Sequence, residues 1–303
     1  MAFIRVKTIK KIDYLYLVQS KWDSLRKTST QQTIKYLGKA SDVTIESIPQ
    51  VYRNNPRILS TLRSKTKNHS KKNLIIEELK KQVFNALKNG EVEKVLLIAE
   101  IYEKETSLSD FYDDILKQVL YEIGYLWEQN KLDIATEHIC SNITNEIIYK
   151  INKSHIKNNK KSNILLCNPD GEIHNIGCNI IGSILLQKGY TVHNISPSSP
   201  TESILNYIKQ TNPSLIMISV TLKDNIESSK RLIKKISTES DIPILLGGLA
   251  ITESSEMEKK DIELITTNVK IITNTTLETL VRIVGRILTK NTTINQMLVQ
   301  RVV

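Results

Sequence analysis

The segment "DGEIHNIG", residues 170–177, places an acid, a histidine and a glycine between two apolar runs. The run before it reads as a buried strand and the run after it reads as a helix. Glu172 stands two residues before His174, so its carboxylate can accept the proton of one ring nitrogen and leave the other nitrogen to bind a metal. Gly177 opens the helix, where a missing side chain permits a bulky group to approach closely. A lone loop histidine is more often a satisfied loop residue, so this pattern needs support from other elements.

A parallel α/β sheet is expected to position this segment. Short apolar runs alternate with helical stretches, an alternation that predicts five parallel strands followed by a helix over residues 276–288. The expected strands are 163–167, 190–195, 214–220, 242–247 and 269–273. Open parallel sheets bind ligands at the carboxyl ends of their strands. Glu172 and His174 therefore lie where a ligand is expected.

Two further strands end in small or hydroxyl residues. Ser219 and Thr221 end the third expected strand, and Gly247 and Gly248 end the fourth. Because the carboxyl ends of parallel strands meet at one edge of the sheet, these residues belong to the same rim as the histidine loop. The rim as a whole favours a ligand site.

The three elements resemble the signature of cobalamin-binding domains, usually written with Asp first and Ser-x-Leu in the middle. In this chain they are Glu172-x-His174-x-x-Gly177, Ser219-x-Thr221 and Gly247-Gly248. The resemblance implies a Rossmann-like cobalamin-binding domain in which His174 replaces the cofactor's own base as the lower cobalt ligand and Glu172 orients it. It also implies that the released nucleotide tail runs beside the other residues of the signature, namely Gly177, Ser219, Thr221, Gly247 and Gly248.

Four amphipathic helices are expected before the sheet, as in a four-helix bundle. They cover residues 73–90, 91–105, 107–132 and 133–156. The expected fold class is therefore α/β plus all-α, with a small basic β/α module ahead of the bundle. The expected domains are a basic module with its linker at 1–72, a bundle at 73–158 that caps the cobalamin, and the cobalamin-binding domain at 161–292.

The bundle contains Trp127 and, after nine residues, the adjacent pair Glu137 and His138. Taken alone, they indicate an interfacial tryptophan and a solvated pair. Ahead of a cobalamin signature, the spacing resembles the cap of the adenosylcobalamin-dependent photoreceptor regulators, including the carotenoid-gene repressors. That resemblance implies that Trp127 covers the upper face of the corrin and that Glu137 and His138 contact the adenosyl group.

The chain departs from those regulators in two places. They usually carry a MerR-like winged helix before the bundle, a pattern that residues 1–72 lack. Their light sensors often have a histidine directly after the tryptophan, where this chain has Glu128. The first departure bears on how DNA is bound, and the second on the state reached after illumination.

Positive charge is concentrated at the N-terminus. Residues 1–72 hold 16 Lys and Arg against 4 Asp and Glu, a net charge of +12, whereas the rest of the chain carries −2. Such a surplus favours a polyanion partner, usually nucleic acid, and the alternative is a solvated face. Residues 13–23 and 29–39 predict a β-hairpin that resembles the N-terminal β module of some insertion-sequence transposases. Residues 45–73 predict a basic helix followed by a Lys/Asn/Ser linker.

Composition indicates a cytoplasmic protein. The three cysteines, at positions 140, 167 and 178, have no paired or metal-ligand spacing, so we expect reduced core thiols. No stretch approaches the length of a membrane span, and the charged N-terminus lacks the apolar region of a signal peptide.

Two functions from different classes follow. The leading hypothesis is a non-enzymatic, light-responsive cobalamin sensor that regulates transcription through a basic N-terminal module binding DNA or RNA. Adenosylcobalamin is the favoured cofactor, with methylcobalamin as the other form, and the chain is expected to be able to form a homo-oligomer. The alternative is a corrinoid methyl carrier that serves methyltransferases, which needs no basic arm. A mutase subunit is less favoured because the substrate barrel it needs is absent from the sequence.

Overall fold

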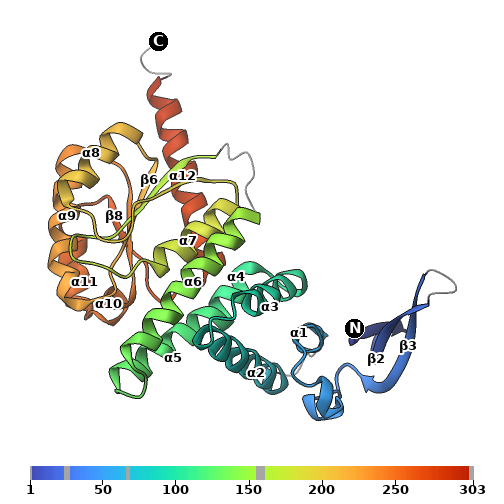
Figure 1. The fold of residues 1–303 in the computed structure, drawn as a ribbon. Coiled ribbons are helices and arrows are strands. Elements are labelled where there is room, and N and C mark those ends of the chain that lie inside the picture. The colour runs from blue at the N-terminus through green and yellow to red at the C-terminus, as the bar shows by residue number, and fades with distance from the viewer. Residues whose placement is uncertain (1, 24–27, 66–68, 155–160, 300–303) are drawn as a thin grey trace. The chain divides into compact units, whose positions relative to one another are not determined.

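The computed structural model describes residues 2–23, 28–65, 69–154 and 161–299 (Figure 1). The chain divides into two compact units, Met1–Ile143 and Thr144–Val303. The expected three-domain division at 1–72, 73–158 and 161–292 stays a prediction. Among the described helices, none combines the length and the apolar character that crossing a membrane requires.

The first unit begins with a three-stranded antiparallel sheet in the order β1-β2-β3. Its strands are β1 (Ala2–Ile9), β2 (Ile12–Asp23) and β3 (Thr28–Lys39). The expected hairpin corresponds to β2 and β3, but the prediction missed β1. In β1, Ala2 and Ile4 are buried whereas Arg5 and Lys7 are exposed, the alternation of a strand with one face on a core.

The basic helix and linker expected over residues 45–73 differ from the structure, in which the first helix starts later and the next helix begins within the expected linker. The chain makes two 3₁₀ turns, η1 (Ile45–Ser47) and η2 (Gln50–Tyr52), before α1 (Pro56–Lys65). Asn55 fixes the start of α1, because its side-chain Oδ1 accepts from the backbone N–H of Arg57 at 3.0 Å. The next helix already starts at His69. Residues 66–68 of the expected linker lie outside the described residues.

The helical bundle is confirmed, with one helix interrupted. Its helices are α2 (His69–Lys88), α3 (Val92–Glu105), α4 (Leu108–Phe111), the π-helix η3 (Tyr112–Leu116), α5 (Lys117–Glu128) and α6 (Ile134–Ser154). The single helix expected at 107–132 is thus divided by a π-helical turn. Phe111, Tyr112 and Ile115 are fully buried at this turn, which rotates the helix so that all three enter the core.

The second unit contains the predicted five-stranded parallel sheet, in the order β5-β4-β6-β7-β8. The strands are β4 (Asn163–Cys167), β5 (Thr191–Asn194), β6 (Leu215–Ser219), β7 (Ile244–Gly247) and β8 (Val269–Ile271). β4 lies between β5 and β6, so the chain leaves β4 toward one edge and later returns to its other side. The carboxyl ends of β4 and β6 therefore form the point at which strand order reverses, where such sheets bind ligands.

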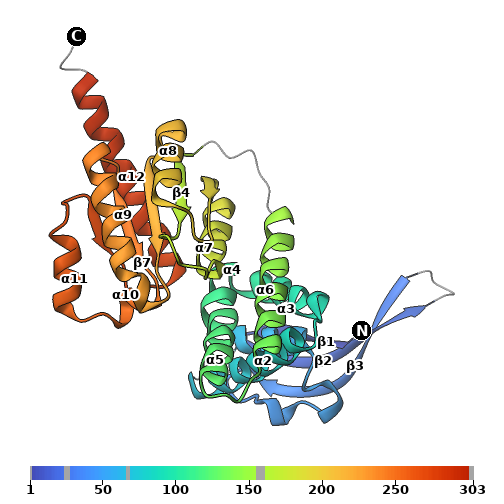
Figure 2. The same cartoon turned by 60° about the vertical axis from the view of Figure 1, so that its left-hand side comes forward.

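Helices cover both faces of this sheet (Figures 1 and 2). α7 (Ile176–Gln187) and α12 (Leu277–Val299) lie on one face, and α8 (Thr201–Thr211) and α9 (Ile226–Glu239) on the other. Shorter helices, η4 (Lys223–Asn225), α10 (Leu249–Glu253) and α11 (Glu256–Glu263), follow β6 and β7. Alternate strand residues such as Leu165 and Ile216 pack in the core that α8 and α9 cover. Burial on both faces explains why the strands read as continuous apolar runs.

Gly248 occupies a position that other residues cannot adopt. Its φ is +113°, and a Cβ there would lie 2.2 Å from the carbonyl oxygen of Val220. The carboxyl ends of β6 and β7 approach each other this closely only because the glycine has no side chain. The sequence predicts that Gly248 borders a ligand, and the structure shows that the backbone of Val220 also requires glycine at this position.

We predict that Gly248→Ala lowers the free energy of unfolding by more than about 3 kcal/mol, because Val220 presents rigid backbone to the new methyl group. Gly124→Ala is the matched control, since it lies within α5 and a Cβ there meets nothing within 4 Å. The control should stabilise the protein by about 0.5–1 kcal/mol. Urea denaturation of both variants measures this, and equal effects would contradict the assignment.

Candidate functional site

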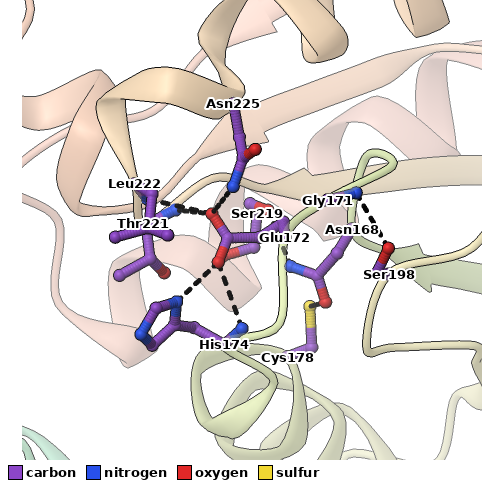
Figure 3. A network of polar contacts seen from close by, with 10 residues as sticks. All are labelled: Asn168, Gly171, Glu172, His174, Cys178, Ser198, Ser219, Thr221, Leu222 and Asn225. Atoms are coloured by element: carbon purple, nitrogen blue, oxygen red, sulfur yellow. Dashed lines mark hydrogen bonds and ion pairs between the residues drawn. The ribbon is translucent and has the colours of Figure 1, made fainter.

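Glu172 lies at the centre of a hydrogen-bond network in the loop between β4 and α7 (Figure 3). Its side chain has no exposed surface. Oε1 accepts from the backbone N–H of His174 at 3.1 Å and lies 2.7 Å from Nδ1 of the same residue. Oε2 accepts from the backbone N–H groups of Thr221 at 2.8 Å and Leu222 at 2.9 Å, and from Nδ2 of Asn225 at 3.1 Å. One carboxylate thus joins the loops after β4 and β6.

The Glu172 carboxylate is charged in spite of its burial. Burial alone raises the pKa of a carboxyl group, but hydrogen bonds from His174, Leu222 and Asn225 outweigh it and lower the pKa of Glu172 to about 2. A buried carboxylate is tolerated only when donors satisfy it. Here five donors surround its two oxygens.

His174 is held through Nδ1 of its ring, and about half of its side chain is exposed. Nδ1 lies 2.7 Å from the Glu172 carboxylate, and 47% of the side chain is exposed. A carboxylate at this distance only accepts, so Nδ1 carries the proton and the lone pair of the neutral ring is on Nε2. The imidazole is therefore held in the tautomer that binds a metal through Nε2.

Backbone contacts hold the loop that carries this pair. Gly171 has a φ of +89°, and its N–H donates to Oγ of Ser198 at 2.8 Å. The N–H of Ser198 in turn donates to the carbonyl oxygen of Glu172 at 2.8 Å. The hydroxyl of Ser228 donates to the carbonyl oxygen of Asp170 at 2.9 Å. The loop is thus anchored from both α9 and the segment after β5.

Asn168 joins the ends of β4 and β6 where strand order reverses. The side chain is fully buried, and its Nδ2 donates to the carbonyl oxygen of Ser219 at 2.7 Å. On the same side, a Cβ on Gly177 would lie 3.6 Å from Oγ of Ser219. The start of α7 therefore faces the end of β6 with no side chain between them.

The structure brings together most residues that the sequence signature named. Glu172, His174 and Thr221 share hydrogen bonds, and Gly177 lies beside Ser219. Gly247 is the register partner of Ser219 across β6 and β7. The contact of Thr221 with this network is through its backbone N–H. All these residues lie at the carboxyl edge of the sheet, as expected.

This donor set fits a cobalt that a corrinoid brings with it. Within the described residues, no group of three His, Cys, Asp or Glu side chains could hold a metal ion. The site instead offers one oriented imidazole. Apolar side chains also stand exposed on the segments that follow β4, β6 and β7, with Ile173 at 69%, Leu222 at 42% and Leu249, the first residue of α10, at 37%. A large, partly apolar ring would cover such a rim.

The predicted cap residues belong to the other unit. Trp127 lies near the end of α5 and is 44% exposed. Glu137 lies in the first turn of α6, where its Oε2 is 2.8 Å from Nδ1 of His138 and its Oε1 accepts from the hydroxyl of Ser141 at 2.6 Å. Glu137 and His138 share the carboxylate–Nδ1 contact of Glu172 and His174, but Glu137 is 26% exposed and His138 is 66% exposed. Their contact with a cofactor stays a prediction.

Sequence reasoning missed the residues that hold the network together, chiefly Asn168, Ser198 and Asn225. Each acts over a long sequence separation, as in the contact of Asn225 with Glu172 over 53 residues. Hydrophobic periodicity reports which face of an element is buried and carries no information on such pairs. The one sequence signal for these contacts is Asn168, an asparagine that directly follows β4 and precedes the histidine loop.

Comparison with known families identifies the cofactor. Residues 162–267 match a family model described as "B12 binding domain", and residues 79–151 match a second model with the same description. The first match covers the sheet with its histidine loop, and the second covers the helical bundle. The chain is a cobalamin-binding protein.

Individual relatives have low sequence identity to the chain, and some of them match over most of their length. The chain is 22% identical over 184 residues to dimethylamine corrinoid protein 3 of Methanosarcina acetivorans, covering 59% of this chain and 86% of that protein. It is 31% identical over 97 residues to methionine synthase of Mycobacterium tuberculosis, covering 31% of this chain but 8% of that protein. Among solved structures, the monomethylamine corrinoid protein of Methanosarcina barkeri matches with a TM-score of 0.55 and 16% identity, covering 69% of this chain and 97% of that one. This likeness supports the fold.

These findings overturn the leading functional hypothesis. The relatives that match over most of their length are corrinoid proteins, so the interpretation as a light-responsive regulator of transcription with a nucleic-acid-binding module is wrong. The error began with the spacing of Trp127 and the Glu137–His138 pair. That spacing spans the end of α5 and the first turn of α6, so a short loop between two helices is enough to produce it.

We predict that Glu172→Gln weakens binding of cobalt by His174 about 10- to 100-fold. The glutamine oxygen would take the three donors at the Oε2 position, so its NH₂ group would face His174 and favour the wrong ring tautomer. Titration of the purified protein with hydroxocobalamin, followed by its visible spectrum, measures the histidine-bound fraction.

Asn225→Ala is the matched control, because it removes one donor from the same carboxylate and leaves the charge beside His174. It should lower the free energy of unfolding by about 1.5–3 kcal/mol while the histidine-bound spectrum persists. If Glu172→Gln keeps the wild-type spectrum and affinity, the tautomer argument fails.

Proposed function

We propose that this chain is a corrinoid methyl carrier that partners methyltransferases and is not itself an enzyme. The observation that carries the proposal is the charged, buried Glu172 that orients an exposed His174 at the carboxyl edge of the sheet. The extensive similarity to dimethylamine corrinoid proteins supports it. A bound cobalamin supplies a cobalt atom that can accept and release a methyl group.

His174 is the lower ligand in this proposal. Its Nδ1–H is held by Glu172, which keeps electron density on Nε2 and fixes the plane of the ring. Because the carboxylate is anchored by the backbone N–H groups of Thr221 and Leu222, the imidazole would keep its plane and its tautomer whether or not a metal is bound at Nε2. A carrier would benefit from a ring that is held ready in this way.

Five residues of the signature are proposed to accommodate the nucleotide tail of the cofactor. They are Gly177, Ser219, Thr221, Gly247 and Gly248. The absence of a side chain at the start of α7 supports this, because Gly177 there borders the hydroxyl of Ser219. At Gly247 and Gly248 a Cβ would instead meet the backbone of Ile272 and Val220, so these glycines keep the strand ends close together beside the proposed path of the tail.

The bundle is proposed to protect the upper face. Trp127 offers an exposed aromatic ring for the corrin, and Glu137 contacts Nδ1 of His138. In a methyl carrier these residues shield the cobalt while it waits for a partner. Adenosylcobalamin is then not required, and methylcobalamin becomes the expected working form.

This proposal predicts similar affinities for cobalamins with different upper ligands. A carrier must hold the cofactor equally well with and without the methyl group, because unequal binding would trap one state of the cycle. Dissociation constants for methylcobalamin and hydroxocobalamin should agree within about tenfold, and adenosylcobalamin should bind no more than about tenfold tighter than methylcobalamin.

Equilibrium titration of the protein in darkness measures all three constants, with His174→Ala as the control for specific binding. A preference of 100-fold or more for adenosylcobalamin would contradict the carrier proposal and return attention to an adenosyl-specific role.

A further inference from the structure

The basic N-terminal sheet has no part in the site described above. Both B12-binding matches begin at or after residue 79, so β1, β2 and β3 lie outside them. One face of this sheet is buried through residues such as Ile4, Leu15 and Leu17. The strand register shows which residues lie on the opposite face of the sheet.

The opposite face combines tyrosines with cations. Across the sheet, Arg5 pairs with Tyr16 and Tyr16 pairs with Tyr36. The neighbouring row joins Lys7 to Tyr14 and Tyr14 to Lys39. We call these six residues the basic tyrosine face. Its four outer members, Arg5, Lys7, Tyr36 and Lys39, are exposed.

The turn beside this face adds two more charges in an unfavourable conformation. Lys10 and Lys11 connect β1 to β2, with φ values of 48° and 65°. A two-residue turn with positive φ at both positions favours Asn-Gly, and lysine is strained there. Asp13 is the acid beside it, and it already contacts Thr8 at 2.6 Å and Lys65 at 3.7 Å. Because lysine is kept at both strained positions, we infer that the positive charge of Lys10 and Lys11 has a function.

The geometry favours an acidic protein over a nucleic acid as the occupant. The rings of Tyr16 and Tyr36 lie 5.0 Å apart at 46°, so each ring covers part of the other. Base stacking needs open aromatic faces. Tyrosine hydroxyls together with Arg and Lys form a set of hydrogen-bond donors that matches carboxylates. Tyr and Arg are also the residues enriched at the centres of protein interfaces.

We propose that the basic tyrosine face docks an acidic surface of the methyltransferase that exchanges the methyl group with the cobalt. This step rests on the proposed function. A docking surface outside the cobalamin modules keeps the partner bound without occupying the face of the corrin where the methyl group is exchanged. Opposite charges on the two surfaces speed their encounter and make it sensitive to salt.

The first arm of the test identifies the occupant. A photo-crosslinking amino acid replaces Tyr36 in cells that produce this chain, and the same amino acid at Met257 is the control, since that side chain is 76% exposed on α11. The expected product is a nuclease-resistant protein adduct at position 36 and not at 257. The captured protein, purified separately, must then transfer a methyl group to or from the cobalamin of the wild-type chain.

The second arm measures docking by kinetics. Lys10→Asn with Lys11→Gly removes two charges and relieves the strained turn, so the variant should fold at least as well as the wild type. Its KM for the captured methyltransferase should rise about tenfold with kcat unchanged. Lys259→Gln with Lys260→Gln, two adjacent lysines on α11, should leave KM unchanged.

Three outcomes would overturn the docking proposal: a nuclease-sensitive adduct, no adduct at position 36 above the control, or a captured protein that exchanges no methyl group. Equal KM values for the two lysine variants would do the same. The proposed function is tested separately with methyl iodide, which should methylate the reduced cobalamin of both variants, with release of iodide, as fast as in the wild type. Failure of this reaction in the wild type counts against the carrier function and not against the docking face.

Discussion

Glu172 is a charged group without exposed surface, and its two oxygens accept hydrogen bonds from two loops that are far apart in the sequence. The donors on one side are the backbone and ring of His174, and those on the other are Thr221, Leu222 and Asn225. A carboxylate in this position costs several kcal/mol unless every oxygen is satisfied. The loops after β4 and β6 are therefore held at the separation at which their donors reach both oxygens of Glu172. The same hydrogen bonds fix the orientation of His174.

The sheet topology makes this bridge possible. Because β4 lies between β5 and β6, the chain leaves β4 toward α7 on one face of the sheet and leaves β6 toward α9 on the other (Figure 1). Asn168 joins the ends of β4 and β6 through the carbonyl oxygen of Ser219. Glycine at positions 177 and 248 keeps the neighbouring backbone close. The candidate site thus depends on backbone geometry as much as on the side chains of Glu172 and His174.

Much of this arrangement follows from local sequence signals. The five strands and the position of the Glu172–His174 loop were predicted because apolar runs and strand-end loops are local features. β1 was missed because the four cations of residues 1–11 obscure its apolar alternation, although Ala2 and Ile4 are buried and Arg5 is exposed, as a strand with one covered face requires. Asn225 could not be found, since its contact with Glu172 depends on how β6 and α9 are placed. The functional error had another source, a residue spacing that two helices and a short loop reproduce by themselves.

The central claim is that Nε2 of His174 binds cobalt from below, and electron paramagnetic resonance of the cobalt(II) form tests it most directly. A single ¹⁴N ligand splits each cobalt line into three, whereas ¹⁵N splits it into two. In protein labelled with ¹⁵N-histidine and loaded with unlabelled cobalamin, the account predicts the two-line pattern, and His174→Ala should lose it. A three-line pattern that persists in the labelled protein would show that the cofactor's own base remains on the cobalt, and would contradict the account.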